Sequence, residues 1–378
     1  MAEINKKQTL GYFDIVGYIN VDSKTFSIQT PSKNNPNWVM NTFNPKVEGD
    51  NGESLYIRIS DGYDIVKGKK IFAISKEKNS LEISFADRHN ENMLDLVDDL
   101  SFIKVGIGKK TATNKQGKEY KTWEFNKFLT AFDAIQFLNQ IMPLATKNKV
   151  RMTGTVKYSE YNGETQRNFD LQSIYLLNGN EDEGKEMECK FNFTQNILID
   201  KNSVDMTAWE EGISKLNARV HVKKKKDVFQ ALPLQFIMRA ETPEKKATIE
   251  KMIKRFFTVE NDTVRRLNIE GYFKSGYIVA NVKEEDLNDE ARDLIDSGLY
   301  TLDEVLGMFA NRDRVDELLL RRPVMKKMQD QKMPKIDMAD DEFTLEYLDS
   351  LLVDDSVTEN MADDIESEDE FLNELENL

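Results

Sequence analysis

Residues 131–177 read AFDAIQFLNQIMPLATKNKVRMTGTVKYSEYNGETQRNFDLQSIYLL, and this stretch decides the expected fold. Its first part, Ala131 to Met142, has apolar side chains at helical spacing and is followed by Pro143, which ends the helix. Two alternating runs come next, at 150–158 and 167–177, with Asn162-Gly163 between them. Asn-Gly in this position is the strongest short-range signal for a β-hairpin. The sequence therefore predicts a helix followed directly by a hairpin.

The regions on both sides of this stretch predict further strands. Helix and hairpin are preceded by strand patterns at 10–20, 38–43, 54–59, 71–74, 81–85, 102–107 and 120–125. A second set follows at 189–199, 218–222, 234–239, 267–272 and 277–282, with a helix over 243–257 that Thr242 caps and Pro243 opens. About five strands with one helix before the last hairpin are typical of an OB-type β-barrel.

The predicted fold class is mainly β with α (α+β): two OB-like β-barrels, a small helical module and a disordered acidic tail. The helical module rests on Asn288 as a helix cap, on a capping box at 301–304 and on a further helical turn from Asp313 to Pro323. The expected domains are residues 1–180, a first barrel carrying a Lys-rich hairpin insertion; 187–284, a second barrel; 285–335, the helical module; and 336–378, the acidic tail.

Composition argues against several kinds of chemistry. The chain has one cysteine, Cys189, and two histidines, His89 and His221, so we expect no disulfide framework, no zinc site and no cofactor. Phosphate-binding and nucleotide-binding glycine motifs and a nucleophile elbow are not found in the sequence. We therefore expect a protein that is not an enzyme. No apolar run of signal-peptide or membrane-span length occurs, which favours a cytoplasmic location, the host cytoplasm if the chain is viral.

Charge is divided unevenly along the 378 residues. From Asp337 to Leu378 the chain has 17 acidic residues and no Lys or Arg. The rest has 52 Lys and Arg against the 50 remaining acidic residues. The net charge of −15 thus describes a near-neutral body with a strongly acidic end.

Cations and rings alternate in one stretch of the body, between Phe102 and Phe128. Unpaired nucleic acid needs cations for its phosphates and flat side chains for its bases, so this ribbon is the first candidate site. Strand alternation places Lys121, Trp123 and Phe125 on one face. The other interpretation is that the rings belong to the barrel core and the lysines are solvated in a loop. The candidate residues of the ribbon are Lys104, Lys109, Lys110, Lys118, Tyr120, Lys121, Trp123, Phe125 and Lys127.

Three further clusters of cations add candidate phosphate contacts, although a run of charge is often only a solvated face. One is on the 150–177 hairpin, one follows the strand at 218–222 and one precedes the strand at 267–272. Their residues are Arg151, Lys157, Tyr158, Arg219, Lys223, Lys224, Lys225, Lys226, Arg265 and Arg266.

The acidic end has apolar residues at helical spacing, which predicts a tail that folds on a partner's groove. These residues are Phe371, Leu372, Leu375 and Leu378. An earlier group, from Phe343 to Leu352, predicts a separate short docking helix. A merely solubilising tail, or a tail that lies in the protein's own basic groove, is the alternative.

A β-barrel body followed by an acidic C-terminal tail resembles phage and bacterial single-stranded DNA-binding proteins. The resemblance covers the plan of the chain, with residues 363–378 similar to the acidic tip of that class, although the chain ends in Leu378 and lacks a Pro-Phe terminus. It implies an OB-fold body that binds the strand and a tail that recruits replication, recombination and repair proteins.

Three functions follow as hypotheses. The first is coating and protecting single-stranded DNA, with RNA as a further ligand, in phage replication or recombination, without a membrane partner. The second is a protein-interaction adaptor, or a host-directed viral factor, whose tail mimics nucleic acid; it predicts no binding of oligonucleotides. The third is a nuclease with a carboxylate metal site, which predicts Mg²⁺-dependent cleavage.

Overall fold

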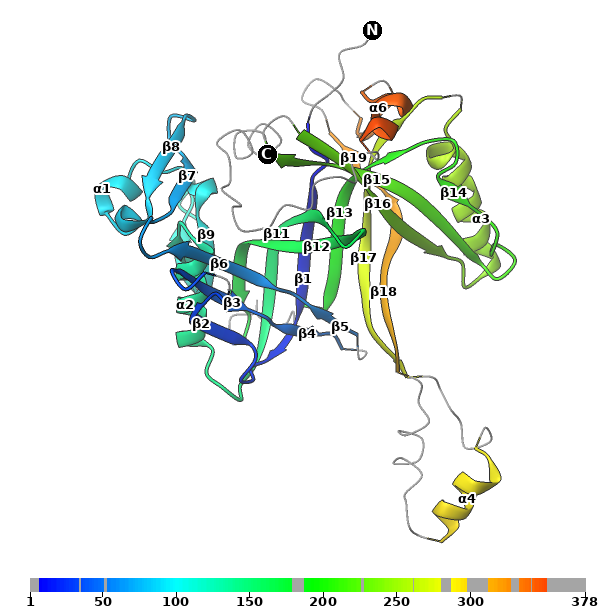
Figure 1. Ribbon diagram of the computed structural model, residues 1–378, viewed down its shortest axis with the longest axis horizontal. Helices are drawn as coiled ribbons and strands as arrows, with labels where there is room; N and C mark the ends of the chain where they lie inside the picture. The colour runs from blue at the N-terminus through cyan, green and yellow to red at the C-terminus, as the bar shows by residue number, and fades with distance from the viewer. Residues whose placement is uncertain are drawn as a thin grey trace.

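The computed structural model describes residues 7–33, 35–50, 53–178, 187–225, 228–260, 262–279, 287–297, 312–327, 333–340 and 342–351. Most of the described chain is β-structure, with a few short helices, and it includes a closed β-barrel (Figure 1). The expected mainly β class with α elements is thereby confirmed.

The second unit of the chain is a closed five-stranded barrel. Its strands pair in the order β13-β15-β16-β18-β17 and back to β13, and β16 and β18 run parallel. The helix α3 lies in sequence between the third and fourth strands of this ring, as in an OB barrel. The elements are β13 (Lys190–Ile199), β14 (Val204–Asp205), β15 (Ile213–Lys225), β16 (Val228–Arg239), α3 (Pro243–Met252), the π-helical turn η3 (Ile253–Phe257), β17 (Arg265–Val279) and β18 (Arg312–Pro323).

Two expectations about the end of this barrel are wrong. The segment 313–323 is the strand β18 and not a helical turn, and the last hairpin pairs β17 with β18 and not residues 267–272 with 277–282. The run Leu318, Leu319, Leu320 misled the helical interpretation, because it is a strand buried on both faces: Leu318 and Leu320 face the barrel core and Leu319 is also buried. Between the two strands, Asn288 does cap a helix, α4 (Asp289–Asp296), which lies well away from the barrels in Figure 1. The capping box at 301–304 lies outside the described residues.

The first unit repeats most of this strand order. Its strands pair as β1-β11-β12-β9-β10, with β12 and β9 parallel, and α2 precedes the hairpin β11–β12 as expected. The Asn162-Gly163 turn and the Lys-rich hairpin are confirmed as well. These elements are β1 (Gly11–Asn20), β9 (Ile103–Thr113), β10 (Glu119–Phe128), α2 (Ala131–Ile141), β11 (Lys147–Tyr161) and β12 (Glu164–Leu176).

The chain between β1 and β9 builds a smaller lobe with its own apolar core. Phe85 and Phe132 pack there with Tyr63. Its elements are β2 (Phe26–Pro31), β3 (Trp38–Phe43), β4 (Lys46–Glu48), β5 (Ser54–Tyr56), β6 (Ile59–Asp64), β7 (Lys70–Ile74), β8 (Ser80–Ser84), η1 (Phe85–Asp87), α1 (Glu91–Leu94) and η2 (Asp99–Ser101).

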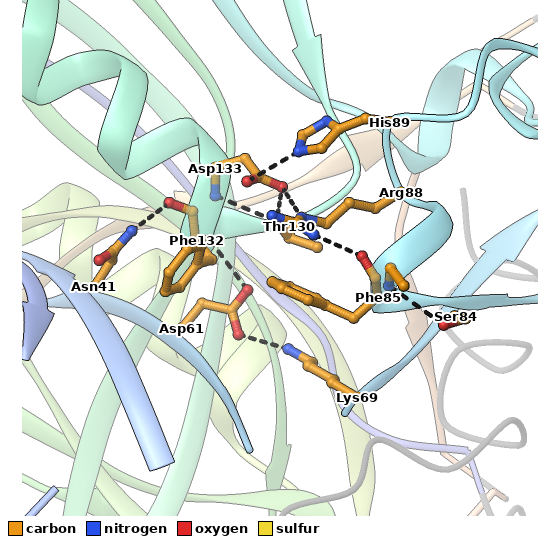
Figure 2. A network of polar contacts seen from close by, with 11 residues as sticks. Asn41, Asp61, Lys69, Ser84, Phe85, Arg88, His89, Thr130, Phe132 and Asp133 are labelled. Atoms are coloured by element: carbon orange, nitrogen blue, oxygen red, sulfur yellow. Dashed lines mark hydrogen bonds and ion pairs between the residues drawn. The ribbon is translucent and has the colours of Figure 1, made fainter. Parts of the chain in front are cut away.

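Polar contacts at the start of α2 hold this lobe in place (Figure 2). Asp61 accepts hydrogen bonds from the Phe132 amide at 3.1 Å and from Lys69 at 2.5 Å. Asp133 accepts from Thr130 at 2.7 Å and from Arg88 at 2.8 Å. Carboxylates at a helix N-terminus are favourable, because they satisfy exposed amides and the helix dipole. The network is therefore structural.

The two units are fused edge to edge. β1 pairs with β11 on one side and, over Gly11–Val16, with β13 of the second unit on the other. A row of rings crosses the joint inside: Phe13 contacts Phe169 at 5.3 Å, Phe169 contacts Phe273 at 5.6 Å, and Phe273 contacts Phe193 at 5.1 Å between ring centres. One continuous core therefore spans both units and fixes their relative placement.

The last described residues return to the second barrel, so the tail does not start at residue 336 as expected. We call residues 333–340 and 342–351 the docked segment; it contains β20 (Lys335–Ile336), which pairs with β19 (Met325–Lys326), β21 (Met338–Ala339), which pairs with β17, and α6 (Leu345–Ser350). Phe343 and Leu348 are buried against Leu198, Ala231 and Val264. The short docking helix is confirmed as α6, and it packs on the second barrel of this chain itself.

Candidate nucleic-acid interface

Three rings gather on the outer face of the first unit. Trp123 and Phe125 of β10 lie edge-on to Tyr175 of β12, at 5.2 and 5.7 Å between ring centres. All three side chains are half-buried, so each keeps surface open to solvent. They are not sealed in the barrel core, and we call them the ring cluster.

Gly106 of β9 is the floor of the ring cluster, because it lies between β10 and β12 and has no side chain. A Cβ atom there would lie 2.9 Å from the Trp123 ring, 3.3 Å from Tyr175 and 3.4 Å from Phe125. The first of these distances is shorter than a carbon–carbon contact allows. The glycine is therefore what lets the three rings converge.

Replacing Gly106 by alanine is expected to push the Trp123 ring away from Tyr175. Tryptophan fluorescence should change, and the affinity for single strands should fall several-fold if the cluster is the stacking surface. Thr113→Ala, at the exposed end of the same strand, is the control. If the Trp123 ring is displaced but Gly106→Ala binds single strands like wild type, the ring cluster is not the stacking surface.

Cations lie beside the rings on both sides. The ammonium of Lys109 lies 5.4 Å from the centre of the Trp123 ring, and the guanidinium of Arg151 lies 5.9 Å from that of Tyr175. Both distances are within the range of a cation–π contact. A base on the rings would thus have a cation for its phosphate on either side.

Arg151 also takes part in an ion-pair bridge across the joint between the units. Its Nε and Nη2 donate to the two carboxylate oxygens of Asp14 on β1, at 2.8 and 3.2 Å, and Lys190 of β13 donates to the same carboxylate. Burial alone would raise the pKa of Asp14, but the hydrogen bonds and charges of Arg151 and Lys190 outweigh it and hold the pKa below its usual value. The bridge therefore carries one net positive charge at neutral pH.

Asp14→Asn is expected to tighten the binding of single strands at low salt, because it leaves Arg151 and Lys190 without their anion. The log–log salt dependence should steepen by about 0.7, the effect of neutralising one additional phosphate.

The stability of Asp14→Asn at pH 7 should fall by about 1 kcal/mol, since partly exposed ion pairs contribute little. Because the pKa of Asp14 in the folded protein is lowered, the stability difference between wild type and Asp14→Asn disappears as the pH falls through that pKa. Fluorescence titrations at two salt concentrations and urea unfolding measure both effects; weaker binding by Asp14→Asn would contradict them.

A second ring–cation group lies further along β1 and β11. Lys147 and Lys149 lie 4.4 and 5.2 Å from the centre of the Tyr18 ring. The sequence interpretation missed these residues, as it missed Tyr175 and Lys190. The spacing Lys147, Lys149, Arg151 was a usable signal, since alternate residues of a strand share one face.

The other ribbon residues lie in ion pairs or at the exposed tip of the hairpin, and not in the ring cluster. Lys104 and Lys127 both bind Asp99, the first at 2.5 Å. Lys110 lies 3.8 Å from Glu124. The tip of the hairpin is exposed, and its candidate residues there are Lys118, Tyr120 and Lys121.

Two candidate residues on the 150–177 hairpin are buried or ion-paired. Tyr158 faces the core, where burial raises the pKa of its hydroxyl, so its assignment to a binding surface was wrong. Lys157 is on the opposite face of the strand and pairs with Asp170 at 2.9 Å.

The docked segment covers the candidate arginines of the second barrel. Arg265 binds Asp340 through two hydrogen bonds of 2.6 and 2.9 Å, and Arg266 binds Glu342 at 2.6 Å and Asp337 at 3.1 Å. Arg219 binds Asp349 at 2.8 Å. These arginines anchor the chain's own carboxylates. The expectation that they form an open phosphate-binding surface is therefore wrong.

The lysine run of the second barrel lies on β15, several strands away from the ring cluster in the sheet order. Lys223 and Lys224 are half-buried and exposed, respectively. The side chain of Lys225, the whole of Lys226 and the tail residues Phe371, Leu372, Leu375 and Leu378 lie outside the described structure.

His221 holds both ends of the described chain to this barrel. Its Nδ1 lies 3.0 Å from the Lys7 carbonyl, its Nε2 lies 3.0 Å from the Tyr347 hydroxyl, and its ring stacks on Phe229 at 4.6 Å. With Nδ1 carrying the proton, both contacts are satisfied by a neutral ring. Burial lowers the pKa of His221, against the opposing bond to Lys7.

This gives an expected loss of stability below pH 6.5, the ordinary pKa of histidine. The unfolded chain takes up a proton there while the folded chain does not, so stability falls with pH until the lowered folded pKa is reached. The slope is at most about 1.4 kcal/mol per pH unit. Urea unfolding of wild type and His221→Gln between pH 7.5 and 5.5 measures it, and parallel curves for the two would contradict the expectation.

The fold and the site together define a mainly β protein in which a closed five-stranded OB-type barrel is fused to a second β unit that has rings and cations on its outer face. No protein-family model matches the chain, and no curated protein does. Among solved structures, the chain is similar to a deletion mutant of the single-stranded DNA binding protein from Thermus aquaticus, with 9% identity and a TM-score of 0.31, covering 86% of this chain and 99% of that one. A similarity this weak carries no argument about function, which therefore depends on the residues of this chain.

Two further findings concern the described residues alone. No group of three or more His, Cys, Asp or Glu side chains among them is arranged to hold a metal ion. No helix in that part of the chain is long and apolar enough to cross a membrane.

Proposed function

We propose that the protein binds single-stranded nucleic acid, with single-stranded DNA as its ligand, and that the ring cluster of the first unit is the stacking surface. The observation that carries the proposal is the convergence of Trp123, Phe125 and Tyr175 over Gly106, with Lys109 and Arg151 at the two sides. Bases offer flat faces only when they are unpaired, so such a surface favours single strands over duplexes. No bond is made or broken in this function.

The proposed role is to coat and protect unpaired DNA in replication or recombination. The sequence supports a division of labour, because the residues after Leu351 include many acidic residues, spaced apolar residues and no Lys or Arg. We assign those following residues to the recruitment of partner proteins, since acidic segments with spaced apolar residues fold on a partner's groove.

The test of the function is a fluorescence and anisotropy titration with a dT oligonucleotide, a U oligonucleotide and a DNA duplex of equal length. Tight binding of dT and weak binding of the duplex are expected, with a log–log salt slope of about −0.7 for each phosphate neutralised. Equal affinity for duplex and single strand, or an affinity that does not change with salt, would overturn the proposal.

A further inference from the structure

We infer that a bound strand does not stay on the first unit: it crosses the joint between the units, over the Asp14 bridge, onto β13 of the second barrel. This inference rests on the proposed function and adds the path of the ligand. It makes Lys190 of the second unit a phosphate contact.

The first argument is that the ring cluster and the bridge form one unbroken series of contacts. Tyr175 contacts Trp123 on one side and Arg151 on the other, at 5.2 and 5.9 Å. Arg151 and Lys190 then hold Asp14 from opposite sides. These residues come from β10, β12, β11, β1 and β13, which follow one another in the sheet with only β9 and its Gly106 between the first two. The series therefore runs across the strands and leads from the first unit to the second.

The second argument is the geometry of the bridge. Asp14 occupies the Nε–Nη2 fork of the Arg151 guanidinium, so a phosphate would meet Arg151 through its remaining N–H groups, beside the Lys190 ammonium. Asp14 holds this fork in place, and the bridge is partly open, with the Arg151, Lys190 and Asp14 side chains 37%, 33% and 30% exposed. A phosphate of the strand can therefore approach two cations whose orientation is already set.

The third argument is the rigidity of the joint. The rings of Phe13, Phe169 and Phe273 interlock beneath it, and Thr165 of β12 bonds the Pro233 carbonyl of β16 at 2.9 Å. The path along the curved sheet from β10 to β13 is thus five strand spacings, about 24 Å. An oligonucleotide of eight residues is within the range of about 4–16 nucleotides that one OB fold engages.

Cys189 offers a reporter at the far end of this path, because it is the only cysteine of the chain and directly precedes Lys190. The experiment labels Cys189 of the full chain with a fluorophore and adds dT8 carrying a quencher at its 5′ or its 3′ end. One of the two oligonucleotides is expected to quench the label strongly, and the other to quench the fluorescence of Trp123, because the strand has one direction along the path. Cys189→Ser/Asp262→Cys, labelled on the same unit but away from the path, is the control and should respond to neither.

A variant provides an independent measurement. Lys190→Ala should weaken dT8 binding at low salt and reduce the magnitude of its log–log salt slope by about 0.7, the effect of one lost phosphate contact, and leave dT3 binding unchanged. If dT8 binds but neither quencher affects the Cys189 label and Lys190→Ala binds like wild type, the path is wrong while the function stands. If neither dT8 nor longer oligonucleotides bind, the proposed function itself fails.

Discussion

Trp123→Ala is expected to weaken the binding of dT oligonucleotides by roughly 5- to 150-fold, since a stacked base contributes about 1–3 kcal/mol. The indole contributes more than its own stacking surface, because its edge also positions Tyr175. Folding should be little affected, as the ring is half-buried on an outer face. Anisotropy of a labelled oligonucleotide gives the affinity, and urea unfolding checks the stability.

Trp209→Ala is the matched control for this prediction. Trp209 is also a half-buried indole with a lysine nearby, 5.2 Å from Lys246, and it bonds Glu250 of α3 at 2.8 Å. It belongs to the second barrel, away from the ring cluster. If Trp209→Ala weakens binding as much as Trp123→Ala does, or if Trp123→Ala has no effect, the ring cluster is not the stacking surface.

The second large effect is expected from truncating the C-terminal segment, and it is an effect on stability. Removing residues 337–378 should lower the free energy of unfolding by at least about 3 kcal/mol, because Phe343 and Leu348 leave a buried apolar contact. The cut also leaves Arg265 and Arg266 without their carboxylate partners. Removing only residues 352–378 should leave stability unchanged within error.

Thermal and urea unfolding of the two truncated chains measure this difference. Strand binding should persist in the shorter cut, which keeps the whole docked segment. Equal stability of the two truncated chains would mean that the docked segment contributes nothing to the second barrel. A loss of strand binding on removal of 352–378 would contradict the division of labour.

Much of the fold could be predicted because local signals agreed with it. The helix at 131–141 and the Asn162-Gly163 hairpin combine periodicity with turn chemistry, and both are in the structure. β18 was predicted wrongly because its central run, Leu318 to Leu320, is buried on both faces and shows no alternation, and periodicity cannot separate such a run from a helix. Its partner β17 is also distant in sequence, which no local pattern shows.

The site was predictable in part for the same reason. Trp123, Phe125 and Lys109 belong to one hairpin, so one stretch of sequence indicated them. Tyr175 and Lys190 join them only through the order of strands in the sheet. Arg265 and Arg266 look like phosphate ligands in the sequence, but the carboxylates that neutralise them come from about 75 residues further along the chain.

The docked segment has a consequence for how a polyanion meets this molecule. Its carboxylates pair with Arg219, Arg265 and Arg266 on the second barrel, whereas the cations beside the rings, Lys109, Lys147 and Arg151, lie on strands of the first unit. For the proposed single-stranded ligand, this uneven distribution of cations favours approach from the side of the first unit.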